Sequence, residues 1–182
     1  MSKPTQLFFG FDPPRNPEEL GLPKIYLRAL LFSTSKRGRI IENMYVSLSR
    51  SETHQSFSIW VYGNEKLVRG SGLFVGEDGV SVNRHFLTPN DASEFKFSEG
   101  RYKIKVYAHL LGDKTKKELF SDAFDITRDE ARQLESRETG IYFDWGPDSD
   151  CYISFVDQRP SNPKLDALLE NMVRDAQKLK KK

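Results

Sequence analysis

Three aspartates lie close together in the stretch YFDWGPDSDCY at residues 142–152, between aromatic side chains. Calcium takes about six to eight oxygen ligands, often from carboxylates in one turn, so Asp144, Asp148 and Asp150 are candidates for a metal site. The closing glutamate and the alternating aspartates of an EF-hand loop are missing, however. Glycine, proline, aspartate and serine at 146–149 are also typical turn residues. We therefore expect a hairpin turn here, and the sequence favours neither a metal ion nor another cofactor.

Histidine, cysteine and serine form no catalytic or metal-binding pattern in the sequence. His54, His85 and His109 are far apart, and none has a second histidine at metal-ligand spacing. No serine lies in a nucleophile-elbow motif. Cys151 is the sole cysteine, which excludes an internal disulfide. Its place in an expected strand predicts a small buried residue. We therefore expect a protein that is not an enzyme.

Positive charge and aromatic rings share one face of the stretch RYKIKVYAH at residues 101–109. Proteins that bind single-stranded nucleic acids use such surfaces. Glu118 and Asp122 follow on the next expected strand, however, and can pair with Arg101, Lys103 and Lys105. The formal net charge of +2 adds no argument for nucleic acid. We expect a solvated face and do not favour nucleic acid as a partner.

Apolar and polar residues alternate along most of the chain, which is the pattern of half-buried strands. The alternation is clearest at residues 101–110, and it recurs at 24–33, 40–49 and 56–63. Turn residues separate these segments. Further strands are expected at 6–10, 68–75, 80–87, 94–98, 118–126, 140–145 and 151–157. Many short strands with no long helix among them predict an antiparallel sandwich or barrel.

The stretch EGRYKIKVYA at residues 99–108 resembles the strand F region of immunoglobulin-like and fibronectin type III sandwiches. In those domains a tyrosine near the start of the strand forms the tyrosine corner, and Tyr102 has that position here. The upstream stretch FLTPNDASEF at 86–95 is similar to the turn that leads into it. The resemblance implies an all-β fold, an antiparallel immunoglobulin-like β-sandwich of about eight to ten strands. It implies no functional residues, because such sandwiches support many unrelated activities.

Two segments carry helical signals. In TRDEARQLES at 127–136, Thr127 and Glu130 have the spacing of a capping box. The C-terminal stretch SNPKLDALLENMVRDAQKLKKK predicts an amphipathic α-helix over residues 162–180, whose apolar face must be buried against something. The chain thus divides into a β-sandwich domain at 1–157 and a linker with the C-terminal amphipathic helix at 158–182. The apolar stripe of this helix contains Leu165, Leu168, Leu169, Met172, Val173, Ala176 and Leu179.

Aromatic residues on the polar faces of the expected strands suggest a contact surface. If Ile59 and Val61 point inward, Trp60 and Tyr62 point outward. Tyr26, Tyr45 and Tyr107 also fall on the polar faces of their strands. So many exposed rings need to be covered, by the C-terminal helix, a second copy or another protein. We hypothesise a non-catalytic protein-interaction module; the alternative is a carbohydrate-binding accessory domain. The candidate partner-binding residues are Trp60, Tyr62, Tyr107, Leu165, Leu169 and Met172.

The sequence also bears on the compartment. The first residues contain no apolar segment long enough for a signal peptide, and no later run approaches the length of a membrane-spanning helix. The polar face of the expected C-terminal helix mixes acidic and basic residues, so a membrane surface is not favoured as its partner. We expect a cytoplasmic protein.

Overall fold

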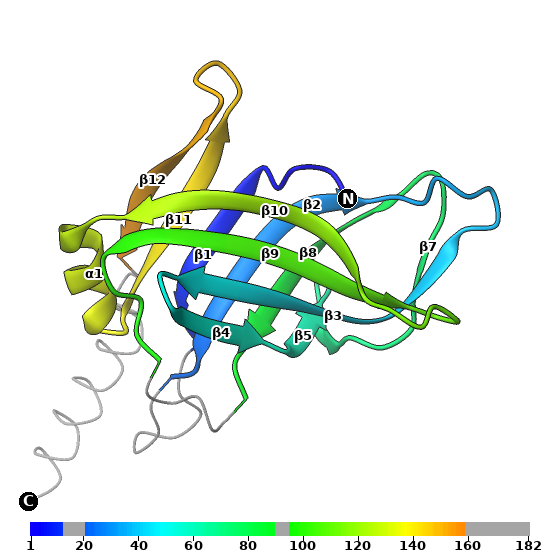
Figure 1. The fold of residues 1–182 in the computed structure, drawn as a ribbon, viewed down its shortest axis with the longest axis horizontal. Coiled ribbons are helices and arrows are strands. Elements are labelled where there is room, and N and C mark those ends of the chain that lie inside the picture. Colours follow the sequence, from blue (N-terminus) through cyan, green and yellow to red (C-terminus); the bar gives the residue numbers. More distant parts are fainter. Residues whose placement is uncertain (13–20, 90–94, 159–182) are drawn as a thin grey trace, which may run out of the picture.

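Two antiparallel β-sheets packed face to face form the body of the protein (Figure 1). The computed structural model describes residues 1–12, 21–89 and 95–158. Sheet A contains seven strands, in the order β12 (Cys151–Gln158), β11 (Thr139–Gly146), β1 (Gln6–Phe11), β2 (Pro23–Leu31), β8 (Val80–Leu87), β5 (Ile59–Tyr62) and β6 (Val68–Arg69). Sheet B contains β10 (Lys117–Ile126), β9 (Gly100–Leu110), β3 (Arg39–Arg50) and β4 (Thr53–Phe57), with β7 (Leu73–Val75) paired to the start of β3.

The expected antiparallel sandwich is confirmed, with more strands than predicted. Residues 70–72, which include two glycines, divide the expected strand at 68–75 into β6 and β7, which pair in different sheets. Residues 95–98 form no strand, although Phe97 is buried. The described part of the chain therefore holds twelve strands.

Strand β9 shows how residue alternation builds the core. Its five inward residues, from position 102 to position 110, are buried, while Arg101 and Lys103 between them are exposed. Across the sandwich, the ring of Phe124 in β10 lies 4.6 Å from that of Phe9 and 4.9 Å from that of Phe143, both in sheet A. Inward aromatic residues of both sheets thus join the two layers.

The prediction that Trp60 lies on the outer face is wrong. Trp60 is 1% exposed, and Tyr62 packs beside it with ring centroids 4.9 Å apart. The chain leaves sheet B after β4 and enters sheet A at β5, with Ser58 between the two strands. The alternation of inward and outward residues need not continue unchanged from one sheet to the other. Here it shifts by one residue, so Ile59 and Val61 point outward.

The helical prediction at 127–136 is confirmed by α1 (Arg128–Glu135), which connects β10 to β11. Both halves of the capping box are present: Thr127 N donates to Glu130 Oε2 at 2.7 Å, and Glu130 N donates to Thr127 Oγ1 at 3.3 Å. The expected C-terminal helix, with Leu165, Leu169 and Met172, lies outside the described residues. Within the described residues, no helix is long and apolar enough to cross a membrane.

Candidate functional site

Five rings on five adjacent strands form one row across the outer face of sheet A; we call it the outer aromatic row. It contains Phe155, Tyr142, Phe8, Tyr26 and His85, each opposite the next in the strand register. Ring centroids are 5.2 Å apart for Phe155 and Tyr142, 4.8 Å for Tyr142 and Phe8, and 5.0 Å for Tyr26 and His85. Directly opposed residues share a face of the sheet, so the register itself assembles this row.

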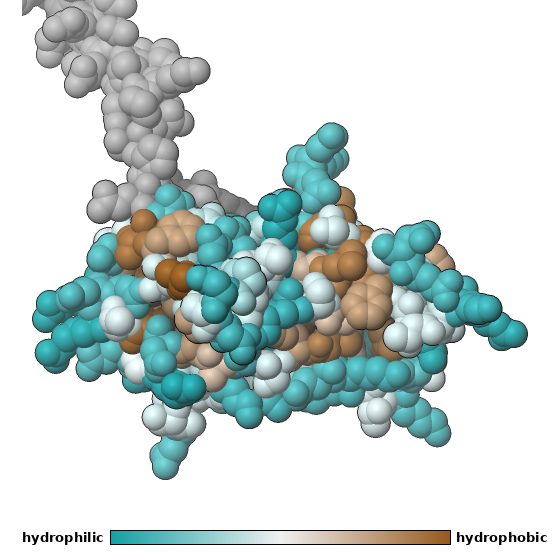
Figure 2. Space-filling view, turned by 90° about the horizontal axis from the view of Figure 1, so that it is seen from above, coloured by the Kyte–Doolittle hydropathy of each residue, from teal (hydrophilic) through white to brown (hydrophobic). Residues whose placement is uncertain are grey.

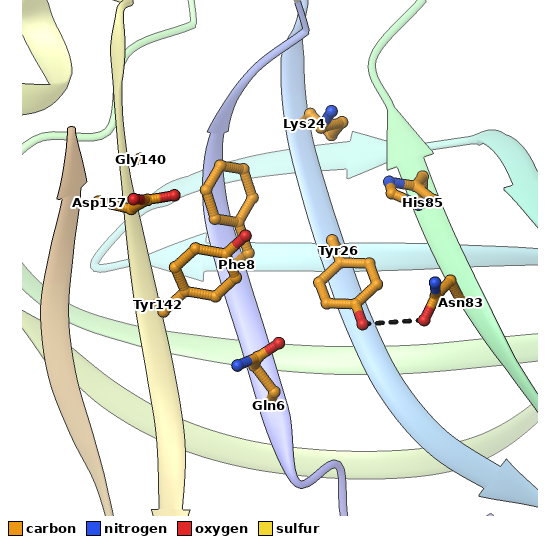
Figure 3. A pocket seen from close by; sticks show the side chains of 9 residues that line it. All are labelled: Gln6, Phe8, Lys24, Tyr26, Asn83, His85, Gly140, Tyr142 and Asp157. Atoms are coloured by element: carbon orange, nitrogen blue, oxygen red, sulfur yellow. Dashed lines mark hydrogen bonds between the residues drawn. The ribbon is translucent and has the colours of Figure 1, made fainter. Parts of the chain in front are cut away.

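A hollow of about 360 Å³ lies over the row (Figure 3). Phe8 lies between Tyr26 and Tyr142 in this view, and it is only 8% exposed although it points outward. The Phe8 ring lies close against the sheet because two nearby positions are glycines: a Cβ atom at Gly140 or Gly10 would collide with the ring. The lining residues are Gln6, Phe8, Lys24, Tyr26, Asn83, His85, Gly140, Tyr142 and Asp157.

Polar side chains at the margin of the hollow are held by hydrogen bonds. Tyr26 Oη donates to Asn83 Oδ1 at 3.0 Å, and burial raises the pKa of Tyr26, which keeps this hydroxyl protonated. Gln6 Nε2 donates to an oxygen of Asp144 at 2.9 Å. Lys24 Nζ lies 2.9 Å from a carboxylate oxygen of Asp12. The hollow therefore has an aromatic floor and an ordered polar margin, as binding pockets commonly do.

His85 is neutral at physiological pH. Burial, and then the charge of Lys24, lower its pKa to about 4, against a smaller opposing effect of Asp12. Its Nδ1 atom is buried and has no hydrogen-bond partner among the described residues. A neutral imidazole with one unpaired ring nitrogen suits recognition of a polar group, and its low pKa does not suit proton transfer near neutral pH.

The outer face of sheet B is organised differently. Tyr45 and Tyr107 stack with centroids 5.1 Å apart, and Lys116 Nζ lies 4.5 Å from the Tyr107 ring. Lys105 Nζ lies 2.6 Å from Glu118 Oε2, and this hydrogen bond lowers the pKa of Glu118. The predicted pairing of the basic strand with acidic residues is therefore present at Glu118.

Asp122, the other acidic residue expected to pair with this strand, contacts Lys3 instead, at 3.3 Å. Arg101, on the basic strand, has its carboxylate partner in Asp125, with 3.3 Å between Nη1 and Oδ2. In the register of the two strands, Asp125 lies directly opposite Arg101, whereas Glu118 lies opposite Tyr107, two residues from Lys105.

The aspartate stretch forms the turn between β11 and β12. Asp144 lies in β11, whereas Asp148 and Asp150 are exposed in the turn. No group of three His, Cys, Asp or Glu side chains is placed to hold a metal ion in the parts of the chain that the structure describes. Cys151 is exposed, so the expectation of a buried cysteine is wrong. It begins an edge strand, which has a neighbour on one side only.

Sequence reasoning missed most of this site. Phe8 and Tyr142 were expected only as parts of strands, and their common row depends on pairing between the two ends of the chain. Of the outward aromatic residues that the sequence suggested, Tyr26 lies in the row, whereas Tyr45 and Tyr107 lie on the outer face of sheet B. Hydrophobic side chains also reach the surface elsewhere, between hydrophilic ones (Figure 2).

No family model matches the chain, and neither a curated protein nor a solved structure matches it.

Proposed function

We propose that this protein is a non-catalytic interaction module that contacts another protein through the outer aromatic row. The row itself is the observation that carries the proposal. Aromatic side chains are enriched at protein interfaces and supply much of their binding energy. Phe155 at one end of the row is 44% exposed, and its neighbour Ile153 is 55% exposed. These positions replace Trp60 and Tyr62 as the contact residues of the proposal.

The strand order supports an immunoglobulin-like interpretation of the sandwich. Strands β1, β2, β8 and β5 follow the order A, B, E, D of such domains, and β10, β9, β3 and β4 follow G, F, C, C′. Tyr102 Oη donates to Ser98 O at 2.8 Å, which is the hydrogen bond of a tyrosine corner. Strands β11 and β12 then extend the first sheet beyond strand A. The fold alone does not identify a partner.

The polar groups beside the row favour binding over catalysis. His85 is neutral at physiological pH, while Lys24 and Asp144 are engaged with Asp12 and Gln6. Groups held in this way can orient a bound surface, but they do not form a nucleophile with an adjacent base. The C-terminal segment with Leu165, Leu169 and Met172 remains part of the proposal as a second contact element.

The test compares two tyrosines from the two outer faces. Proteins that bind the full-length chain are captured, and the affinity of a purified binder is measured for wild type, Tyr142→Ala and Tyr107→Ala. If the row is the interface, Tyr142→Ala weakens binding by about 30-fold, the effect of an interface hot spot of about 2 kcal/mol. Tyr107→Ala leaves the affinity unchanged. Equal affinities for wild type and Tyr142→Ala contradict the proposal.

The composition of the hollow favours one alternative, a carbohydrate ligand. Tyr142 and Tyr26 offer ring faces beside the amides of Gln6 and Asn83 and the carboxylate of Asp157. A sugar ring can stack on the former and exchange hydrogen bonds with the latter. A glycan array probed with wild type and Tyr142→Ala tests this, and the absence of any retained glycan that depends on Tyr142 removes it.

A further inference from the structure

Strand β12 is an edge of sheet A without the features that usually keep edge strands from pairing. Natural edges carry lysines, prolines or bulges, or they are very short. The opposite edge, β6, has two residues. In sheet B, β10 has an irregular register and several charges, and β4 has mainly polar residues.

By contrast, β12 has eight residues, CYISFVDQ, with one charged side chain and no proline. Its register with β11 is unbroken from end to end. Ile153 and Phe155 are both exposed on it. The hairpin of β11 and β12 extends beyond the neighbouring strands in Figure 1, so its turn end is accessible. Such a strand is suited to pairing with a further strand.

The backbone groups at the free edge can be assigned from one hydrogen bond. Trp145 N donates to Thr5 O at 3.0 Å, so the backbone of Trp145 faces β1. Because these directions alternate along a strand, Asp144 faces β12, and its register partner Ile153 faces back to β11. The N–H and C=O groups of Ser154, and of the residues two positions before and after it, therefore point to the free edge.

We propose that two copies of this chain pair through their β12 strands, antiparallel and centred on Ser154. Ser154 then forms a hydrogen-bonded pair with its own copy. Ile153 of each chain lies opposite Phe155 of the other, in a pair without hydrogen bonds, where side chains come closest. A centre on Phe155 would instead place Ile153 opposite Asp157, which makes that register less favourable.

This pairing joins the two outer aromatic rows. The two-fold axis is perpendicular to the sheet, so both copies present the same face on the same side. The ring contact of Tyr142 with Phe155 in one copy is then extended by the apolar side chain of Ile153 from the other. A single strand pair buries less than the roughly 1,600 Å² of a standard interface, so the dimer is weak and its fraction rises with protein concentration. This pairing depends only on the edge strand β12 and does not require the proposed protein partner.

Cysteine cross-linking tests the register on the full-length chain. All variants carry Cys151→Ser, and one adds Ile153→Cys while another adds Phe155→Cys. Positions 153 and 155 of two copies have Cα atoms about 4.5 Å apart, within the range of about 4.4–6.8 Å for a disulfide. Identical positions are diagonal neighbours about 7–8 Å apart. Mild oxidation should therefore cross-link the mixture and neither variant alone.

Proline substitution separates dimer formation from folding. Ser154→Pro removes an N–H group that faces the free edge, so the monomer keeps its melting temperature while dimerisation weakens at least tenfold in sedimentation experiments. Phe155→Pro, the matched control, removes an N–H group that faces β11 and lowers the melting temperature.

The proposal is overturned if Ser154→Pro dimerises like wild type, if single cysteine variants cross-link as well as the mixture, or if the chain stays monomeric without a mixed cross-link. The last result would indicate that residues 159–182 cover the edge.

Discussion

The two outer faces of the sandwich use aromatic residues in different ways. On sheet B, a lysine covers the stacked pair Tyr45 and Tyr107, and ion pairs such as Lys105 with Glu118 link neighbouring strands. On sheet A, rings form a row across five strands, and the charged groups lie at its margin. On sheet B, the outer rings and charges are thus paired with side chains of neighbouring strands. Sheet A presents a continuous surface that suits a large partner.

The largest effect is expected at Trp60, an aromatic residue that lies on neither outer face. Trp60 is buried between the sheets, so Trp60→Ala should destabilise the protein by about 3–5 kcal/mol. Tyr107→Ala, on the outer face of sheet B, should cost far less. Urea denaturation of both variants measures this, and similar losses would contradict the assignment of Trp60 to the core.

Gly140 tests how the row of sheet A is built. A larger side chain would displace Phe8 from its place over this glycine, so Gly140→Val should cost about 1–3 kcal/mol. Gly76→Ala is a suitable control, because its Cβ atom would meet only Phe74 at 3.7 Å. Denaturation midpoints of the two variants check the prediction. Equal stability would mean that the row does not depend on a close approach at Gly140.

His85 makes the stability of the face that carries the row depend on pH. Its folded pKa of about 4 lies below the ordinary value of 6.5, so the unfolded chain binds a proton more readily between these pH values. Stability therefore falls as the pH decreases from pH 7 to pH 5, and the partial exposure of the ring to water reduces the size of this loss. His85→Phe should reduce this dependence of stability on pH. Urea titrations at the two pH values would contradict the account if wild type and His85→Phe responded alike.

The smallest effect concerns the ion pairs of sheet B. Lys105 and Glu118 are exposed at the surface, where water screens their attraction. Glu118→Gln should leave the melting temperature nearly unchanged and slightly reduce its dependence on salt concentration. Thermal melts at low and high salt measure it. A large loss of stability would show that sheet B depends on its charged pairs more than its exposure suggests.

Local patterns predicted a good part of the fold. The alternation of β9 is regular because all its inward residues face one core. Thr127 and Glu130 begin α1 through contacts three residues apart. The turn at 146–150 also follows from local residue types. Each of these features depends on neighbours in the sequence, so the sequence alone was sufficient to find it.

Features that depend on distant pairing were not predictable in the same way. Trp60 faces the core because the chain changes sheets at Ser58, and this crossing leaves no clear mark in the alternation. Phe8 joins Tyr142 only because strands from opposite ends of the chain pair in one register. Cys151 is exposed because the register places it on the outer face with Ile153 and Phe155, on a strand that has a neighbour on one side only.

The most direct test of the account is photo-cross-linking from the two outer faces. A photoreactive phenylalanine analogue replaces Tyr142 in one version of the full-length chain and Tyr107 in another, and both are irradiated in cells. The account predicts one discrete cross-linked protein product from position 142 and none from position 107. Products of equal yield from both positions, or none from position 142, would contradict the claim that the outer aromatic row is the contact surface.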